Sequence, residues 1–209
     1  MDLVIAKLIM RLAKKRDCNM AVLTEKQIKY GFDYYHKDDT RPKSVVEVSE
    51  YDGEDKLIIN CTQLDENYSA KDKKRIWMEW CDFLVNNPDT FTELMFCTRM
   101  PQDLFDAVCA QRRLKRLHIK WGVYPDISKL EKLQELKYLH IGSGRSVSSL
   151  EPISRLVNLV ALSIENFQQI DDYAPLANLK HLESLALEGD FAAPKILKVQ
   201  SLGFLRHMK

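Results

Sequence analysis

One nine-residue phrase recurs along the second half of this 209-residue chain. It has aliphatic residues at its first, fourth and sixth places, as in LKRLHIKWG at 114–122 and LKYLHIGSG at 136–144. Counting a degenerate first copy and a partial last one, the copies begin at residues 91, 114, 136, 159, 182 and 205. Successive starts lie 22 or 23 residues apart. A period of this length predicts a solenoid in which each repeat is one coil.

The second half of each period is also patterned. In VSSLEPISRLVN (147–158) and IDDYAPLANLKH (170–181), a proline is followed by an apolar residue and then, three residues later, by leucine. DISKLEKLQE (126–135) keeps the leucines and lacks the proline. These segments are the expected return path of each coil, with their leucines facing the core.

The strand phrase and the Pro-Leu-x-x-Leu return together resemble the leucine-rich repeat proteins, in their short, internalin-like subclass, over about residues 91–209. The resemblance implies an α/β solenoid with a curved parallel sheet, in a bacterial-like binding protein. The sequence departs from the family pattern after the strands. Gly144, Phe167 and Asp190 stand near the place of the usual asparagine.

Side chains in a strand alternate between its two faces, so each phrase has inward and outward positions. The inward positions carry apolar residues in every coil, and these are aliphatic except in the degenerate first copy, which has Phe96. Stacking the coils lets these residues cover one another, since a single coil has too little apolar area to close a core. We expect the following residues to point inward: Leu117, Ile119, Leu139, Ile141, Leu162, Ile164, Leu185 and Leu187.

The outward positions vary from coil to coil and are expected to face solvent on a concave sheet. Coils two and three carry two imidazoles, two cations and nearby aromatic rings, whereas the next coils carry small residues and two carboxylates. Arginine and aromatic residues often anchor interfaces. The predicted partner-binding residues are Arg116, His118, Lys120, Trp121, Tyr138, His140, Glu165 and Glu188. The alternative is a solvated face without a special role. We expect the two imidazoles to begin to charge near pH ~6.5.

The chain before the repeats is organised differently. Residues 1–19 read as an amphipathic helix or an extension, because Met20 is a possible alternative start. Residues 20–90 read as a small α+β capping region, so that the whole N-terminal part is helix, β-hairpin, helix. The hairpin is predicted over 45–61, around Asp52-Gly53. The second helix is predicted over 69–87 and would cover the first coil, since a solenoid end needs a cap.

Charge and cysteine content bear on whether the chain binds nucleic acid or membrane and whether it contains disulfides. Lys and Arg number 31 against 30 Asp and Glu, a formal charge of +1, so no global pull toward nucleic acid or membrane is expected. Five cysteines form no C-x-x-C pair, and the N-terminus lacks the order of a secretory signal. We therefore expect reduced thiols and a cytoplasmic monomer. Membrane-surface contact through Lys14, Lys15 and Arg16 is the alternative.

No motif for catalysis or for a metal is found. There is no G-x-S-x-G nucleophile elbow and no glycine-rich nucleotide loop. His118 and His140 occupy the same place in adjacent coils, but two ligands are too few for zinc. The sequence predicts no enzyme activity, no catalytic residue, no metal, no cofactor and no small-molecule substrate. It predicts a non-enzymatic protein-protein interaction module for an unidentified partner protein.

Two other functions remain open from sequence. One is an enzyme, toxin or effector with its activity in residues 20–90 and the repeats used for targeting. The other is nucleic-acid binding through the basic second repeat. That cluster comprises Arg112, Arg113, Lys115, Arg116 and Lys120. Its alternating positions would divide it between two faces of the sheet, and true nucleic-acid binding would weaken steeply with salt.

Overall fold

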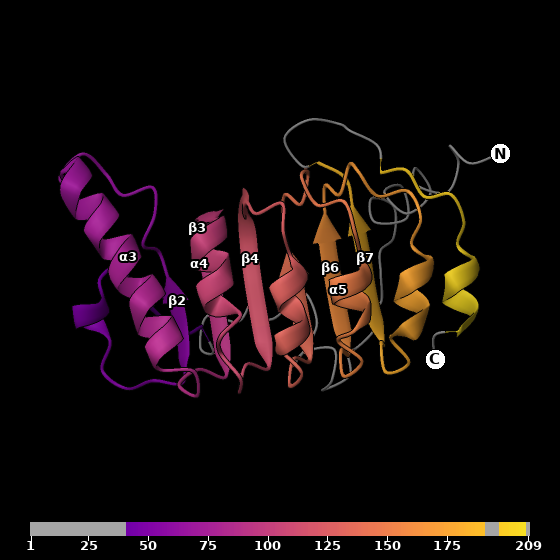
Figure 1. Cartoon of the computed structure of the whole chain (residues 1–209), viewed down its shortest axis with the longest axis horizontal. Helices are drawn as coiled ribbons and strands as arrows, with labels where there is room; N and C mark the ends of the chain where they lie inside the picture. Colours follow the sequence, from indigo (N-terminus) through magenta and orange to yellow (C-terminus); the bar gives the residue numbers. More distant parts are fainter. Residues whose placement is uncertain (1–40, 191–196, 208–209) are drawn as a thin grey trace, which may run out of the picture.

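The computed structural model describes residues 41–190 and 197–207, so the helix or extension expected over 1–19 lies outside the described residues. Seven parallel strands form one sheet, and they follow one another across it in chain order (Figure 1). Their bounds are β1 Lys43–Val45, β2 Lys56–Ile59, β3 Glu93–Pro101, β4 Arg116–Val123, β5 Tyr138–Ile141, β6 Ala161–Glu165 and β7 Ser184–Glu188. The sheet order is that of an open solenoid in which each coil adds one strand.

The predicted inward leucines form one continuous row. Leu117 pairs with Leu139, Leu139 with Leu162, and Leu162 with Leu185. A second row runs from Ile119 through Ile141 and Ile164 to Leu187. The members of both rows on β4, β5 and β6 are fully buried. The predicted phasing of the repeat is therefore confirmed, and each buried aliphatic side chain contributes about 1.5–3 kcal/mol to the stack.

Short helical segments follow the strands and cover one face of the sheet (Figure 1). They are the α-helices α3 Ala70–Asn86, α4 Gln102–Val108 and α5 Glu151–Ser154, and the 3-10 helices η4 Ser128–Lys132, η5 Ala174–Asn178 and η6 Gly203–His207. Neighbouring segments contact one another along the stack. Their apolar residues share one core with the inward rows. This two-layer arrangement is consistent with an α/β repeat solenoid.

The return segments turn where the proline pattern places them. Pro152 and Pro175 stand in the first turns of α5 and η5, where a fixed φ favours a helical turn and the missing N–H costs nothing. The residues after them, Ile153 and Leu176, are fully buried. The partial copy at Leu205 falls within η6, a 3-10 helix, and does not form a strand.

The predicted β-hairpin over 45–61 is wrong. β1 and β2 pair in parallel, and β2 then pairs in parallel with β3, so both strands extend the repeat sheet. Residues 46–55 cross over between them and include the 3-10 helix η3, Val48–Glu50. Within this crossover, the ring of Tyr51 packs edge-on against the rings of Phe83 and Phe91, with centroid distances of 5.3 Å and 5.5 Å. This packing holds the crossover against the helical side of the sheet. The chain therefore passes over the sheet before β2 begins, and Asp52-Gly53 does not form the two-residue turn of a hairpin.

The helix predicted over 69–87 is confirmed as α3. Ser69 is its N-cap, and its hydroxyl accepts a hydrogen bond from the Asp72 amide at 3.1 Å. The face of the helix that points to the sheet is apolar. The buried residues on it are Ile76, Trp80, Cys81 and Leu84. The helix covers the first strands of the sheet, as Figure 1 shows.

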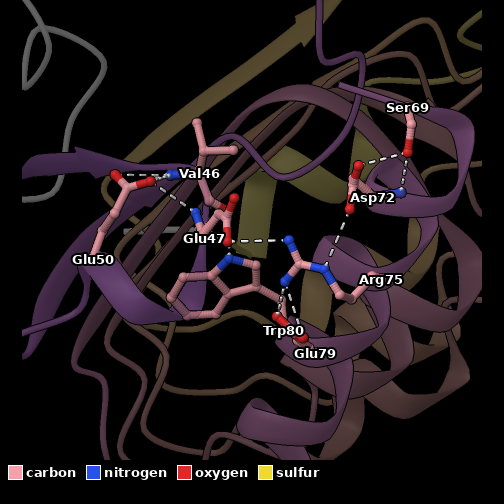
Figure 2. A network of polar contacts seen from close by, with 8 residues as sticks. All are labelled: Val46, Glu47, Glu50, Ser69, Asp72, Arg75, Glu79 and Trp80. Atoms are coloured by element: carbon pink, nitrogen blue, oxygen red, sulfur yellow. Dashed lines mark hydrogen bonds and ion pairs between the residues drawn. The ribbon is translucent and has the colours of Figure 1, made fainter. Parts of the chain in front are cut away.

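Polar contacts attach α3 to the crossover between β1 and β2 (Figure 2). The indole Nε1 of Trp80 donates a hydrogen bond to the Val46 carbonyl at 2.8 Å. Arg75 donates to Glu79 within the helix at 2.9 Å and to Glu47 of the crossover at 3.3 Å. The indole bond is the stronger constraint, because Trp80 is buried whereas the arginine and its partners are partly exposed to water.

A buried glutamine joins the end of α3 to the first repeat. Gln111 is fully buried, and its side-chain amide donates to the carbonyls of Leu84 at 2.6 Å and Asn87 at 2.9 Å. Its side-chain oxygen accepts a hydrogen bond from the Phe91 amide at 3.2 Å. One side chain therefore satisfies three backbone groups at the place where the helix ends and β3 begins.

Candidate interaction face

The outward side chains of the strands form the face opposite the helical segments, called the outward face below. Two rows of paired residues define it. The first row runs Glu93, Arg116, Tyr138, Ala161, Ser184, and the second runs Met95, His118, His140, Ser163, Ala186. The predicted sorting of strand residues into inward and outward rows is thus confirmed.

Arg116 and Tyr138 form the centre of the first row. The guanidinium carbon of Arg116 lies 4.8 Å from the centre of the Tyr138 ring, and its Nε lies 3.5 Å from a carboxylate oxygen of Glu93. Both side chains were expected to face solvent, but Arg116 is 3% exposed and Tyr138 is 1% exposed. The expectation of solvent exposure is wrong at these two positions, where the arginine packs over the tyrosine ring and beside the Glu93 carboxylate.

His118 and His140 are stacked in the second row. Their ring centroids are 4.2 Å apart and their planes are inclined by 10°. The Nδ1 atom of His140 lies 2.9 Å from the Ser163 hydroxyl, within hydrogen-bond distance. Desolvation lowers the pKa of His140 to about 4. Desolvation, followed by the nearby His140, Arg116 and Lys120, lowers the pKa of His118 well below its usual range.

These shifts correct the expectation that the imidazoles begin to charge near pH ~6.5. A buried imidazole loses the hydration that stabilises its cationic form, so it stays neutral to a lower pH. At neutral pH the pair is uncharged, and stacking it costs no like-charge repulsion.

The remaining candidate residues lie toward the carboxyl ends of the strands. Lys120 and Glu188 are exposed, and Trp121 and Glu165 are partly exposed. Glu165 and Glu188 are paired across β6 and β7. We call these four residues the carboxyl-end strip. Lys120 and Glu188 are the exposed members of the predicted set.

A glycine separates the basic and acidic halves of this strip. Gly142 directly follows β5, and its amide donates a hydrogen bond to the Ile119 carbonyl at 2.8 Å. A Cβ atom at this position would lie 1.8 Å from the carbonyl oxygen of Lys120. Only glycine fits this approach of two backbones, so the strip has no side chain between Lys120 and Glu165.

The structure does not bring the basic residues of the second repeat together. Arg112 pairs with the carboxylate of Asp89, and Arg113 donates a hydrogen bond to the Asp89 carbonyl at 3.0 Å. Both precede β4, whereas Lys120 lies near its far end and Arg116 is buried between them. The cluster is divided along the strand as well as between its faces.

Among the described residues of the region from 20 to 90, an open hollow lies between η3 and the last turns of α3. It is lined by Val48, Ser49, Glu79, Asp82, Phe83, Asn86 and Asn87. Its ionisable lining residues are the two carboxylates Glu79 and Asp82.

Within residues 41–190 and 197–207, the cysteines Cys61, Cys81, Cys97 and Cys109 form no disulfide. Within the same residues, no group of three or more His, Cys, Asp or Glu side chains is arranged to hold a metal ion. No helix in this part of the chain has the length and apolar character needed to cross a membrane.

Comparison with known proteins found similarity among solved structures alone. No protein-family model and no curated protein matches it. Among solved structures, an internalin from Listeria monocytogenes matches over 59% of this chain and 40% of its own length, with 20% sequence identity and a TM-score of 0.38. The chain thus spans less than half of that internalin, and the likeness is too distant to assign a partner.

Proposed function

We propose that this chain is a non-enzymatic protein-interaction module whose partner protein binds the outward face of the repeat sheet. The observation that carries the proposal is the contrast between the two sides of each strand. The inward rows are apolar and, from β4 onward, aliphatic, and they are fixed by packing. The outward positions differ in charge, size and hydrogen-bonding capacity from coil to coil, and those of the carboxyl-end strip are exposed or partly exposed.

The first contact is proposed at the carboxyl-end strip. Lys120 and Trp121 form a basic and aromatic half, and Glu165 and Glu188 form an acidic half. A partner with an acidic group opposite Lys120 and a basic group opposite the two carboxylates would match this division. Trp121 would act as the anchor, since large aromatic side chains contribute most of the binding energy at interfaces.

A pair of matched double variants tests this proposal. In the first, Lys120→Ala is combined with Trp121→Ala. In the second, Lys180→Ala is combined with Val157→Ala, two exposed residues of the return segments. Proteins captured from native lysate by the unmodified chain are identified by mass spectrometry, and the affinity of each purified candidate is then measured for both variants.

The proposal expects a partner whose affinity falls by about tenfold or more with the first variant and is unchanged with the second. Equal binding to both variants would place the interface elsewhere. Equal loss with both would indicate an effect on folding, which is checked by comparing their melting curves with that of the unmodified chain.

A further inference from the structure

The sheet ends at β7 with a strand that is apolar on its inward side and only partly buried. β7 is the last strand in the order of the sheet (Figure 1), and none of the residues that the structure describes pairs with its far edge. The members of both inward rows on β4, β5 and β6 are fully buried, whereas Leu185 and Leu187 on β7 are partly exposed. Both rows therefore end with leucines that a further strand would cover.

Hydrogen bonds toward β6 identify the backbone groups that face this edge. The amide of Ser184 and the carbonyl of Glu188 both form hydrogen bonds on the β6 side. Successive residues of a strand direct their N–H and C=O groups to alternate sides. The N–H and C=O groups of Leu185 and Leu187 therefore point away from β6, where a further strand would bond to them.

The two edges of the sheet differ in how well they suit an added strand. β1 has three residues, of which Lys43 and Ser44 are exposed, and the Lys43 ammonium lies 2.7 Å from a carboxylate oxygen of Asp52. Short edge strands that carry lysine resist the addition of another chain. β7 has five residues and contains neither lysine nor proline. An added strand is therefore expected at β7.

We propose that β7 binds an extended segment of a partner protein as a further parallel strand, with aliphatic residues at the two inward positions and a basic residue beside Glu188. Aliphatic side chains at those positions would cover Leu185 and Leu187 and continue both inward rows. Glu188 is exposed and lies directly opposite Glu165. Like charges in this arrangement destabilise a strand pair, and a cation on the free side of Glu188 offsets that repulsion.

The expected pattern of the segment is therefore aliphatic-x-aliphatic-basic. β4 of this chain has the same pattern in Leu117, His118, Ile119 and Lys120, so a segment of this kind fits one rung of this sheet. In such strand addition, main-chain hydrogen bonds provide the affinity and alternate side chains provide the selectivity. This edge is a second binding surface, beyond the partner contact proposed at the carboxyl-end strip.

A capped synthetic peptide, Ser-Val-Thr-Val-Lys, tests the proposal on the purified full chain. Hydrogen exchange of the backbone amides is followed by NMR as the peptide is added. The amides of Leu185 and Leu187 are expected to exchange more slowly as the peptide binds. The amide of Ser184, which already bonds toward β6, is expected to keep its exchange rate.

Two methylated peptides distinguish strand pairing from simple apolar contact. In a parallel pair, the first, third and fifth peptide residues direct their N–H and C=O groups toward β7. Methylation of the third and fifth peptide nitrogens is expected to weaken binding by about tenfold or more, because two hydrogen bonds are lost. Methylation of the second and fourth, which face away from β7, is expected to leave the affinity unchanged. Equal effects of the two would overturn the proposal, and the reverse order would overturn the parallel arrangement.

A charge exchange at Glu188 tests the basic position. Glu188→Lys is expected to weaken binding of the peptide by about threefold and to strengthen binding of the same peptide with a final glutamate. Its melting temperature is compared with that of the unmodified chain, and if it does not fold, the methylated peptides decide. Slow exchange at Leu185 and Leu187 before any peptide is added would mean that the edge is already occupied, which would overturn the proposal. No natural partner is used, so failure here is distinct from failure of the contact proposed at the carboxyl-end strip.

Discussion

The imidazole of His118 lies parallel to that of His140, with ring centroids 4.2 Å apart. The two residues are directly paired across β4 and β5, so the spacing of the strands sets the spacing of the rings. Two neutral rings stack well at this distance, whereas two charged rings would repel each other. The pair therefore makes the stability of the sheet depend on pH.

We predict that acid destabilises the protein through this pair. The pKa of His140 is about 4 in the folded chain, and the ordinary value in an unfolded chain is about 6.5. Below pH ~6.5 the unfolded state binds protons that the folded state excludes, so the free energy of unfolding falls as the pH drops toward 4. The expected loss from His140 is on the order of 2–3 kcal/mol. Denaturant titrations from pH 7.5 to 4 measure it.

The control for this prediction is the double variant His118→Gln and His140→Gln. It keeps polar side chains of similar length but removes both titrating groups. Its free energy of unfolding should fall less than that of the unmodified chain between pH 6.5 and 5, where most carboxylates are still ionised. Parallel pH profiles for the two proteins would show that other groups control acid stability.

The inward leucine row gives the second prediction. Leu139 is fully buried between Leu117 and Leu162, so Leu139→Ala leaves a cavity and should lower the free energy of unfolding by about 2–5 kcal/mol. The matched control is Leu205→Ala, since Leu205 is 40% exposed. It should cost less than about 1 kcal/mol. Equal losses in chemical denaturation would contradict the described packing.

The repeat period predicted this core well, for a physical reason. Every inward position of a coil packs on the same position of the next coil, so the requirement for an aliphatic residue recurs with the period. The pairing of Leu117 with Leu139 could therefore be read from sequence. The crossover at 46–55 could not. Alternating apolar residues suit an antiparallel hairpin and a parallel crossover equally, and the choice depends on the distant packing of Tyr51 against Phe83 and Phe91.

The candidate site was only partly predictable for a related reason. Strand periodicity predicts which side of the sheet a residue occupies, and it correctly predicted that Arg116 and Tyr138 lie in one outward row. It does not indicate how deeply that row is buried, since burial depends on the packing of the whole fold. The burial of these two side chains, and the lowered pKa of His140 beside them, are tertiary effects.

Gln111 gives the third prediction, which no sequence pattern indicated. Replacing it with leucine keeps the volume but leaves the carbonyls of Leu84 and Asn87 and the amide of Phe91 without this partner. The expected loss in the free energy of unfolding is about 2–4 kcal/mol, since buried polar groups without a hydrogen bond are costly. Gln134→Leu, on an exposed turn, should change stability by less than about 1 kcal/mol. Urea denaturation of both variants checks the difference.

The last prediction compares Gly142 with Gly53. Glycine is needed at Gly142 because two backbones approach closely, and at Gly53 because the backbone has a positive φ. At Gly142 a Cβ atom would lie 1.8 Å from the carbonyl oxygen of Lys120, which is backbone and cannot rotate away. At Gly53 a Cβ atom would meet nothing within 4 Å, but the residue has φ of +107°. Gly142→Ala must therefore separate β4 from the chain after β5, whereas Gly53→Ala only strains a local turn.

We expect Gly142→Ala to lower the free energy of unfolding by about 3 kcal/mol and Gly53→Ala by about 1 kcal/mol. Hydrogen exchange distinguishes the two mechanisms. The amide of residue 142, which donates to the Ile119 carbonyl, should exchange much faster in Gly142→Ala, because the two backbones no longer approach closely. In Gly53→Ala that amide should keep its protection once the change in global stability is allowed for. Unchanged protection at 142 in the first variant would mean that β4 and the end of β5 are not in the contact described.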